Sequence, residues 1–405
     1  MASDVAKLVD QIHASGKQLV LVVNGGSEAI SSLLTVPGAS RSVLLAIAPY
    51  SSAALAEWLG SRPEQFCSAR TARAMAMVAY EKARQLAGLP RNVGNETPES
   101  NLLGVACTVS LASDRAKRGS HRFFVATQAA DSTTCLQVEL EKGRRPRAEE
   151  ERLAARSILS EIAAAWGGTD HPALELTQHE AVTRSAKTAP ASWQALLAGN
   201  LHRVRMRRGP AQSAESSCKN VPVPFYADAG IGSQSPQALF PGAFNPLHGG
   251  HRGMAKTASQ LLGVPIEFEI SIANVDKPAL DFIEIDERLK QFTADETVWL
   301  TRAPTFAEKA ALFPGVTFIV GADTLERIAL PRYYQEQIPG MLQAIEKIAA
   351  AGCRFLVFGR KVKEAFQGLS NLDVPPSLKA LCQEVPESDF RQDISSTDLR
   401  KQQER

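Results

Sequence analysis

The sequence predicts an α/β protein with one α/β domain at its N-terminal end and a parallel-sheet α/β domain at its C-terminal end. Short apolar runs such as Gln18–Val23 and Val316–Val320 have the length of buried strands, and helical stretches separate them. Turns that are polar or contain glycine follow these runs. The chain has 405 residues, which is enough for roughly two or three domains. We expect domains over residues 1–168 and 236–405, joined by a linker over 169–235.

The composition is that of an ordinary globular protein. The chain is 44% hydrophobic and 22% charged, and its net charge of +2 gives no general attraction to nucleic acid or to a membrane. The cysteines form no C-x-x-C pair, so neither a zinc site nor a disulfide framework is indicated. Residues 1–17 lack the apolar core of a signal peptide, and no apolar run reaches the ~18 residues that span a bilayer. We therefore expect a cytoplasmic or nucleocytoplasmic protein.

Strands and helices alternate through residues 1–168. The strand Gln18–Val23 ends in a glycine turn, after which Ser27 is placed to cap a helix that reaches about Leu34. A charged helix over Ala148–Trp166 keeps its apolar residues on one side and closes the domain. Between these lie a predicted helix over Ser68–Leu86 and predicted strands over Val43–Ala48, Leu102–Val109, Phe123–Ala126 and Thr134–Leu140.

The same region resembles the C-terminal domain of the CinA family, which includes nicotinamide-nucleotide amidases. The resemblance is carried by Leu34–Ser40, Pro49–Ser51, Leu59–Gly60 and Gly104–Thr108. It covers about the first 168 residues. The resemblance implies a ligand pocket at the edge of an α/β sheet, and it also implies self-association, which is common in such domains.

The chain departs from that family at the positions that carry the chemistry. Asn24–Ser27 stands in place of the family's Ser-Cys-Thr-Gly-Gly loop, and Ala54–Leu55 stands where a lysine follows the family's tyrosine. Val109–Ser113 lacks the glycines and the proline of the family. We therefore expect a domain that keeps the pocket but does not hydrolyse amides. Retained deamidase activity is the alternative.

Residues 169–235 have a less regular pattern, in which Pro, Ser and Thr are common. We expect a linker with some packed helix around Trp193–Leu197. The basic run Leu201–Arg208 is predicted to be a solvated segment, and contact with a nucleic acid or a phosphate is the alternative interpretation.

The strongest signal in the chain is the segment Gly242–His251, which follows the short apolar run Ala238–Phe240. Apolar residues then recur at helical spacing until Gly263, so the segment is predicted to be a strand-to-helix turn. Such turns lie at the carboxyl ends of strands, where the helix start offers free N–H groups to an anion. His248 and His251 can both donate N–H groups to one phosphate. Taken alone, the H-x-x-H spacing also suits a pair of metal ligands or a polar helix start.

The segment resembles the G-x-F-[DN]-P-x-H-x-G-H motif of the nucleotidylyltransferase superfamily, and every fixed position is filled, including Gly242, Phe244 and Asn245. A second segment, Ile394–Arg400, resembles the I-S-S-T-x-x-R signature of the same superfamily. Its hydroxyls and the guanidinium one turn later suit a second phosphate cradle, although an ordinary helix cap would use the same residue types. The residues concerned are Ser395, Ser396, Thr397 and Arg400.

Between the two motifs the spacing of strands and helices predicts a Rossmann-like sheet. Strands are expected at Ile266–Ile272, Val316–Val320 and Phe355–Phe358. Asp323 follows one of these strands, where the resemblance implies a contact with the nucleotide sugar, and a helix N-cap is an equally simple role. Arg360 follows another strand and adds a cation at the same edge.

The segment Thr301–Lys309 resembles the lining of the pyridine-nucleotide pocket in nicotinate and nicotinamide mononucleotide adenylyltransferases. The resemblance implies an aromatic platform for the pyridine, for which Trp299 and Phe306 are the candidates, with Thr305 beside them. Both aromatic residues could equally be core residues. The resemblance therefore favours ATP and a pyridine mononucleotide as substrates. A cytidylyl or a pantetheine-phosphate adenylyl transferase is the alternative within the superfamily.

No nucleophile signature stands out, so the predicted reaction is direct attack by the acceptor phosphate on the α-phosphorus of ATP, with pyrophosphate as the leaving group. The expected catalytic residues are His248, His251 and Arg400. Mg²⁺ is expected to arrive with ATP rather than in a metal site of the protein. The resemblance implies a homo-oligomer, and no nucleic-acid or membrane partner is expected. A rival of another class is a nucleotide-binding sensor or scaffold without turnover.

Overall fold

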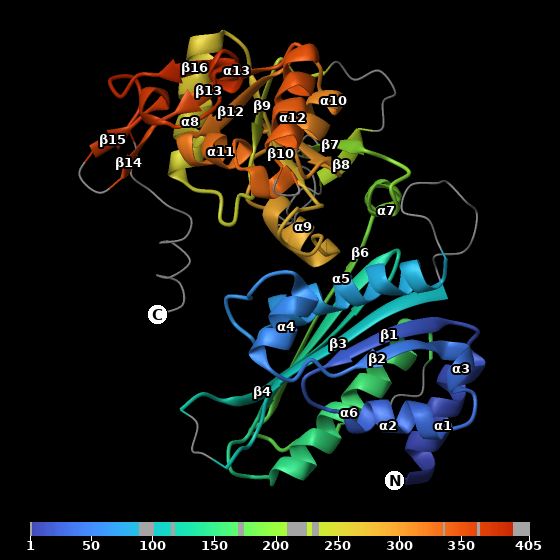
Figure 1. The fold of residues 1–405 in the computed structure, drawn as a ribbon. Helices are drawn as coiled ribbons and strands as arrows, with labels where there is room; N and C mark the ends of the chain where they lie inside the picture. The colour runs from blue at the N-terminus through green and yellow to red at the C-terminus, as the bar shows by residue number, and fades with distance from the viewer. Residues whose placement is uncertain are drawn as a thin grey trace, which may run out of the picture. The chain divides into compact units, whose positions relative to one another are not determined.

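The structure is a computed structural model that describes residues 2–88, 101–114, 118–168, 174–208, 225–228, 235–334, 337–362 and 365–391. The chain divides into two compact units (Figure 1). Unit 1 comprises Met1–Asn200 together with Asp276–Ile285, and unit 2 comprises Leu201–Val275 together with Asp286–Arg405. None of the helices within the described ranges is long and apolar enough to cross a membrane.

Unit 1 contains a mixed sheet in the order β2-β1-β3-β4-β5-β6. β1 pairs in parallel with β2 and β3, whereas the remaining pairs are antiparallel. The strands are β1 (Gln18–Val23), β2 (Val43–Ile47), β3 (Leu102–Ser110), β4 (His121–Gln128), β5 (Ser132–Leu140) and β6 (Ala181–Thr188). The predicted strands of this region are therefore confirmed, and β6 is an additional edge strand.

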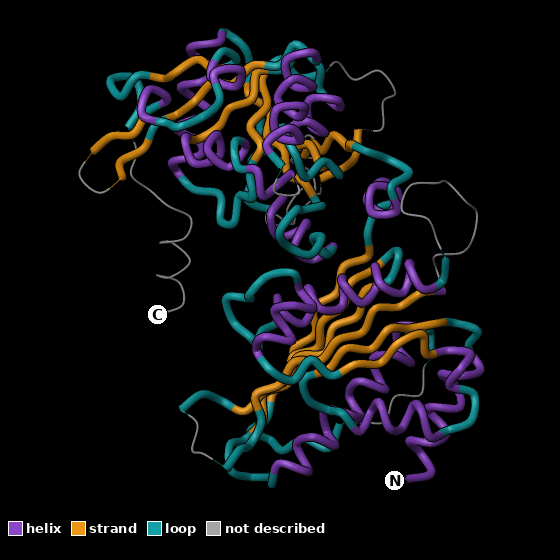
Figure 2. Tube along the Cα trace, in the orientation of Figure 1, coloured by secondary structure: helices purple, strands orange, loops and turns teal. Residues whose placement is uncertain are grey.

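Helices cover both faces of this sheet (Figure 2). The helices of this unit are α1 (Ala2–Ala14), α2 (Glu28–Thr35), α3 (Ala39–Ser42), α4 (Ser52–Leu59), α5 (Ala69–Leu86), α6 (Arg147–Ala165) and α7 (Ala191–Ala198), of which α7 follows β6 and lies beyond its end. One core contains buried residues of α1, α2 and α6 packed on β1 and β3. α5 lies on the opposite face, so close that a Cβ atom at Gly104 would lie 2.1 Å from the carbonyl oxygen of Ala76. Ser27 precedes α2, but its side chain makes no capping hydrogen bond, so that part of the prediction is wrong.

Unit 2 contains a sheet in the order β16-β13-β12-β9-β10-β11-β7-β8. The strands from β16 to β11 are parallel, whereas β7 and β8 are antiparallel at one edge. The strands are β7 (Arg203–Arg208), β8 (Phe225–Asp228), β9 (Ala238–Pro241), β10 (Ile266–Ser271), β11 (Val298–Thr301), β12 (Thr317–Gly321), β13 (Arg354–Phe358) and β16 (Cys382–Val385). The Rossmann-like prediction is confirmed, because the parallel part of the sheet starts at β9, proceeds outward through β10 to β11, and then continues with β12 on the other side of β9.

The helices of this part of the chain are α8 (Gly249–Leu262), α9 (Phe282–Leu289), α10 (Phe306–Leu312), α11 (Ala322–Ile328), α12 (Ile338–Ala350) and α13 (Pro376–Lys379). Short 3₁₀ turns lie at Pro331–Tyr334 and Leu369–Asn371, and β14 (Arg360–Val362) pairs with β15 (Ala365–Gln367) as a separate ribbon. The main core of the unit packs α10, α11 and α12 on β12 and β13.

Residues 169–235 differ from the predicted linker, because they contribute β6 and α7 to unit 1 and β7 and β8 to unit 2. The predicted helix around Trp193–Leu197 is confirmed as α7. The basic run is not a solvated segment but the strand β7, which pairs with β11 and β8 and whose alternate residues Val204 and Met206 are buried. The guanidinium groups of Arg203 and Arg205 lie 5.3 and 5.7 Å from the ring centre of Trp299.

Candidate functional site

The strand order of unit 2 reverses between β9 and β12, which makes that place the topological switch point of the sheet. The register pairs Ala238 with Thr317 and Leu239 with Phe318 at the start of both strands. In open α/β sheets, ligands bind outside the carboxyl ends of the strands at this point. The segment Gly242–His251 follows β9, and Gly321–Asp323 follows β12, so the fold brings both predicted segments to the same edge.

The turn after β9 is shaped by an aromatic core. Phe244 has a φ of 44°, which is rare for a residue with a side chain, and it is 1% exposed. Its ring packs edge-on against Phe240 and Phe268, with ring centres 5.5 and 5.4 Å away. A Cβ atom at Gly242 would lie 2.6 Å from the ring, so only glycine fits there without a shift. The ring of Phe244 therefore fixes the turn from inside the core, which differs from the predicted phosphate contact.

Two residues that the sequence analysis missed hold the backbone of this turn. Arg288 Nη1 donates to the carbonyl oxygen of Ala243 at 3.0 Å. Gln291 donates from Nε2 to the carbonyl oxygen of Phe244 at 3.0 Å and accepts from the N–H of Leu247 at 2.7 Å. Arg288 is 7% exposed, so its hydrogen bond is protected from water. These contacts join residues far apart in the sequence, and no local pattern could have indicated them.

The two histidines lie at the start of α8 as predicted. His248 is the N-cap residue and His251 lies in the first turn, with the ring centres 3.7 Å apart and 24° between the ring planes. The backbone N–H of His248 donates to Nδ1 of His251 at 3.3 Å. Because Nδ1 accepts this bond, a neutral His251 carries its proton on Nε2.

The environment keeps both imidazoles uncharged at neutral pH. Burial, with a smaller contribution from His248, lowers the pKa of His251 to about 4. Burial also lowers the pKa of His248. Nδ1 of His248 is buried and has no hydrogen-bond partner among the described residues. The pair therefore offers neutral N–H donors, together with the helix N-terminus, to an anion.

Ser271, at the carboxyl end of β10, is a further residue that the sequence analysis missed. Its Oγ atom is buried and has no hydrogen-bond partner within the described ranges. β10 is the neighbour of β9. Ser271 ends β10 and His248 follows β9, so both lie at the carboxyl edge of adjacent strands. Buried polar atoms without partners are rare in folded proteins and mark positions where a ligand or water completes the hydrogen bonding.

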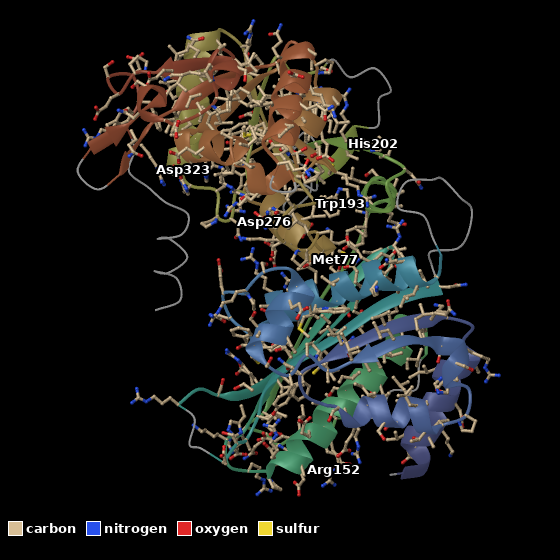
Figure 3. The ribbon with its side chains drawn as sticks, in the orientation of Figure 1. Met77, Arg152, Trp193, His202, Asp276 and Asp323 are labelled. Atoms are coloured by element: carbon tan, nitrogen blue, oxygen red, sulfur yellow. The ribbon has the colours of Figure 1, made fainter. Side chains whose placement is uncertain are left out.

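Asp323 and Arg360 meet at the same edge. Asp323 lies in the first turn of α11 (Figure 3), and Arg360 follows β13. The Nε atom of Arg360 lies 2.5 Å from Oδ1 of Asp323, and the two side chains are 54% and 46% exposed. The N-cap of α11 is Gly321, so the N-cap alternative for Asp323 is wrong. The fold thus places an accessible carboxylate and an accessible cation beside the switch point.

The segment Thr301–Lys309 begins at the carboxyl end of β11, but its residues have different environments. Trp299 is 2% exposed and donates its indole N–H to Glu267 at 2.6 Å, so it is a core residue rather than a platform. The Thr305 hydroxyl accepts from the N–H of Glu308 and caps α10. Phe306 is partly buried against Phe318, with ring centres 5.3 Å apart, and it retains some exposure.

A buried ion pair stabilises this part of the edge. Lys309 Nζ lies 2.7 and 2.8 Å from the carboxylate oxygens of Glu269, and these side chains are only 6% and 1% exposed. The hydroxyl of Thr301 also donates to Glu269. The pair fixes α10 to β10 and β11. The predicted second cradle, comprising Ser395, Ser396, Thr397 and Arg400, lies outside the described residues.

Comparison with protein families agrees with the predicted C-terminal domain. Residues 239–402 match the family model described as Cytidylyltransferase-like. The match begins in β9 and includes both predicted motifs. It shows a nucleotidylyltransferase-type domain at the C-terminal end of this chain, whereas the donor and the acceptor are not identified by it.

Several solved structures resemble part of the chain. The competence/damage inducible protein CihA from Agrobacterium tumefaciens is 20% identical, with 40% of this chain and 95% of that chain covered at a TM-score of 0.32. A CinA superfamily protein from Escherichia coli is 14% identical, with 40% and 87% covered at a TM-score of 0.31. A competence or damage-inducible protein from Enterobacter asburiae is 16% identical, with 40% and 98% covered at a TM-score of 0.32. Comparison with curated proteins gave no match.

Proposed function

From the premise that residues 239–402 form a cytidylyltransferase-like domain, we propose that the chain transfers AMP from ATP to nicotinamide or nicotinate mononucleotide and releases pyrophosphate. The family match supports nucleotidyl transfer in general. The observation that carries the proposal is the neutral, stacked pair His248 and His251 at the start of α8, beside the switch point of the sheet.

The proposed reaction is in-line attack by the acceptor phosphate on the α-phosphorus of ATP. A new P–O bond forms to the acceptor phosphate as the bond to the bridging oxygen of pyrophosphate breaks. Nε2 of the neutral His251 ring carries a proton, so the ring can donate a hydrogen bond without first becoming charged. It is therefore suited to donate to a nonbridging oxygen whose negative charge grows during the displacement. His248 has an unfilled hydrogen-bonding atom for the same purpose. Donors fixed in advance by the turn stabilise the transition state without reorganising.

Asp323 is proposed to accept hydrogen bonds from a ribose hydroxyl, with Arg360 holding the carboxylate in place and facing the nucleotide. Ser395, Ser396, Thr397 and Arg400 are proposed to hold the β and γ phosphates. Mg²⁺ is proposed to arrive with ATP; within the described ranges there is no group of three or more His, Cys, Asp or Glu side chains that could hold a metal ion. When bound, it would offset phosphate charge.

The acceptor is proposed to lie between the ends of β10 and β11. Phe306 is the remaining aromatic candidate for stacking on the pyridine, because Trp299 is buried. Ser271 is proposed to donate to, or accept from, the acceptor, because its Oγ lacks a partner within the described ranges. These assignments support a small polar acceptor with an aromatic ring.

The test is pyrophosphate release by the purified protein with ATP or CTP and Mg²⁺. Nicotinamide mononucleotide, nicotinate mononucleotide and phosphopantetheine are offered separately as acceptors. We expect release with ATP and a pyridine mononucleotide, and a loss of roughly 10²-fold or more in His251→Ala. Preference for CTP or for phosphopantetheine would overturn the proposed substrates. No release with any pair, despite ATP binding, would favour a sensor without turnover.

A further inference from the structure

Gln291 holds the turn before His248 at two points. Its Nε2 donates to the carbonyl oxygen of Phe244 at 3.0 Å, and its Oε1 accepts the N–H of Leu247 at 2.7 Å. One side-chain amide therefore connects both ends of the segment that leads into His248. All of these residues belong to unit 2, so the arrangement depends on contacts within that unit alone.

The neighbours of the Gln291 amide determine its orientation. The N–H of Leu247 can only donate, so it requires the amide oxygen. The carbonyl oxygens of Phe244 and Arg288 can only accept, and Nε2 lies 3.0 and 3.4 Å from them. A flipped amide would place its oxygen against two carbonyl oxygens and its NH₂ group against an N–H. Both bonds to the turn are therefore made by one orientation of the amide.

The backbone of Gln291 is itself fixed within unit 2. The next residue, Phe292, is 1% exposed, and its ring centre lies 5.1 Å from that of Phe268 and 5.5 Å from that of Phe244. The carbonyl oxygen of Gln291 accepts from Nη2 of Arg252, in the first turn of α8, at 2.8 Å. The aromatic core and α8 thus hold the residue in place, so its side chain can support the turn without moving with it.

The next backbone N–H after that of Leu247 belongs to His248, and it donates to Nδ1 of His251. At 3.3 Å this bond is longer than the ~2.9–3.0 Å that is most common, so a small displacement of the backbone would break it. The bond keeps the proton of the neutral His251 ring on Nε2. Without it, part of the His251 rings would carry their proton on Nδ1, and Nε2 of those rings could not donate to a phosphate.

We propose that Gln291 is a positioning residue for nucleotidyl transfer: it fixes the backbone that leads into His248, and the fixed backbone keeps the proton of His251 on Nε2. This inference rests on the proposed function, in which Nε2 of His251 donates to the phosphate. Gln291 acts through the histidines and not on the reacting atoms. Displacement of a catalytic group by about 1 Å can cost ~10²-fold in rate, so the loss of this support is measurable.

The experiment compares Gln291→Met with Ser259→Ala in the full chain. Ser259 is a matched control because its hydroxyl also bonds to the backbone, donating to the carbonyl oxygen of Val264 at 2.8 Å, but at the opposite end of α8. The ¹⁵N chemical shifts of the His251 ring, assigned by their loss in His251→Asn, report which nitrogen carries the proton. We expect Gln291→Met to move these shifts toward the average of the two tautomers at pH 7. We also expect it to lower kcat by about tenfold or more with a smaller change in KM. Ser259→Ala should retain the kcat and the ring shifts of the parent chain.

The results separate the two proposals. An active parent chain with unchanged kcat in Gln291→Met would overturn the positioning role. Ring shifts of His251 that stay at their parent values in this variant would overturn it as well, whether or not the parent chain is active. Equal changes in Ser259→Ala would also overturn it, because any loosening of α8 would then have the same effect. A parent chain inactive with all substrates, whose ring shifts nevertheless respond to Gln291→Met, would overturn the proposed function alone. Should Gln291→Met not fold, Gln291→Asn serves the same test, because an amide that is one methylene shorter cannot reach both backbone groups.

Discussion

Acidification should destabilise unit 2 through His251. Its pKa is 6.5 in the unfolded chain and about 4 in the folded protein, lowered by burial and then by His248. The neutral ring is therefore favoured by the fold. This stability is fully present above pH 6.5 and is lost as the pH falls toward 4, because the unfolded chain binds the proton first. Proton linkage then lowers the free energy of unfolding by about 2 kcal/mol between pH 7 and pH 5.

The measurement is native-state hydrogen exchange of the slowest amides in β9 and β10, at pH 7 and pH 5, in the parent chain and in His251→Asn. Asparagine does not titrate, and its Oδ1 can accept the N–H of His248 in place of Nδ1. All other titrating groups are shared by the two proteins, so the difference between them isolates His251. We expect the parent chain to lose about 2 kcal/mol more than the variant. An equal loss in both proteins would refute the argument from burial.

Three further perturbations test the edge of the unit 2 sheet. Lys309→Met should lower the free energy of unfolding by about 3 kcal/mol or more in urea titration, because the carboxylate of Glu269 stays buried without its cation; recovery in a variant that also carries Glu269→Leu is the control. Arg360→Ala should raise the KM for ATP several-fold and leave the melting temperature unchanged, since it and Asp323 are about half exposed; an unchanged KM would remove this pair from the ATP site. Gly242→Ala should cost about 1–3 kcal/mol by forcing its Cβ into an aromatic ring 2.6 Å away; wild-type stability in thermal unfolding would contradict that geometry.

The sequence predicted the elements whose signal is local. β1 is a continuous apolar run, and α5 and α6 are long helices with apolar faces, so length and period identify them. β6 was missed because its residues are mostly exposed and polar, which leaves no apolar alternation to detect. β7 was misjudged because its arginines concealed the alternation of Val204 and Met206. Strands at or next to the edge of a sheet are defined by their partners more than by their own residues.

For the candidate site too, the sequence predicted only the features that have a local signal. The turn after β9, the helix start and Asp323 were predicted because strand, turn and helix follow one another in the sequence. By sequence, Trp299 could stack on the pyridine or belong to the core, and its hydrogen bond to Glu267 shows that it belongs to the core. The hydrogen bonds from Arg288 and Gln291 to the turn after β9 join residues that are far apart in the sequence. The assignment of residues 276–285 to unit 1 likewise depends on distant contacts, those of Arg73 and Phe282. No pattern in a single sequence reports such long-range contacts.

Unit 1 is formed by two segments that lie far apart in the sequence, so its folding depends on the order in which the chain is synthesised. Nascent chains usually fold domain by domain from the N-terminus while translation proceeds at roughly 5–20 residues per second. Unit 1 cannot complete itself when Asn200 emerges from the ribosome, because Phe282 and Asp281 are still to be synthesised. Several seconds of translation separate the two events, and during that interval Trp193 and Arg73 lack their final partners. Unit 1 therefore completes its fold only after residues 276–285 have been synthesised.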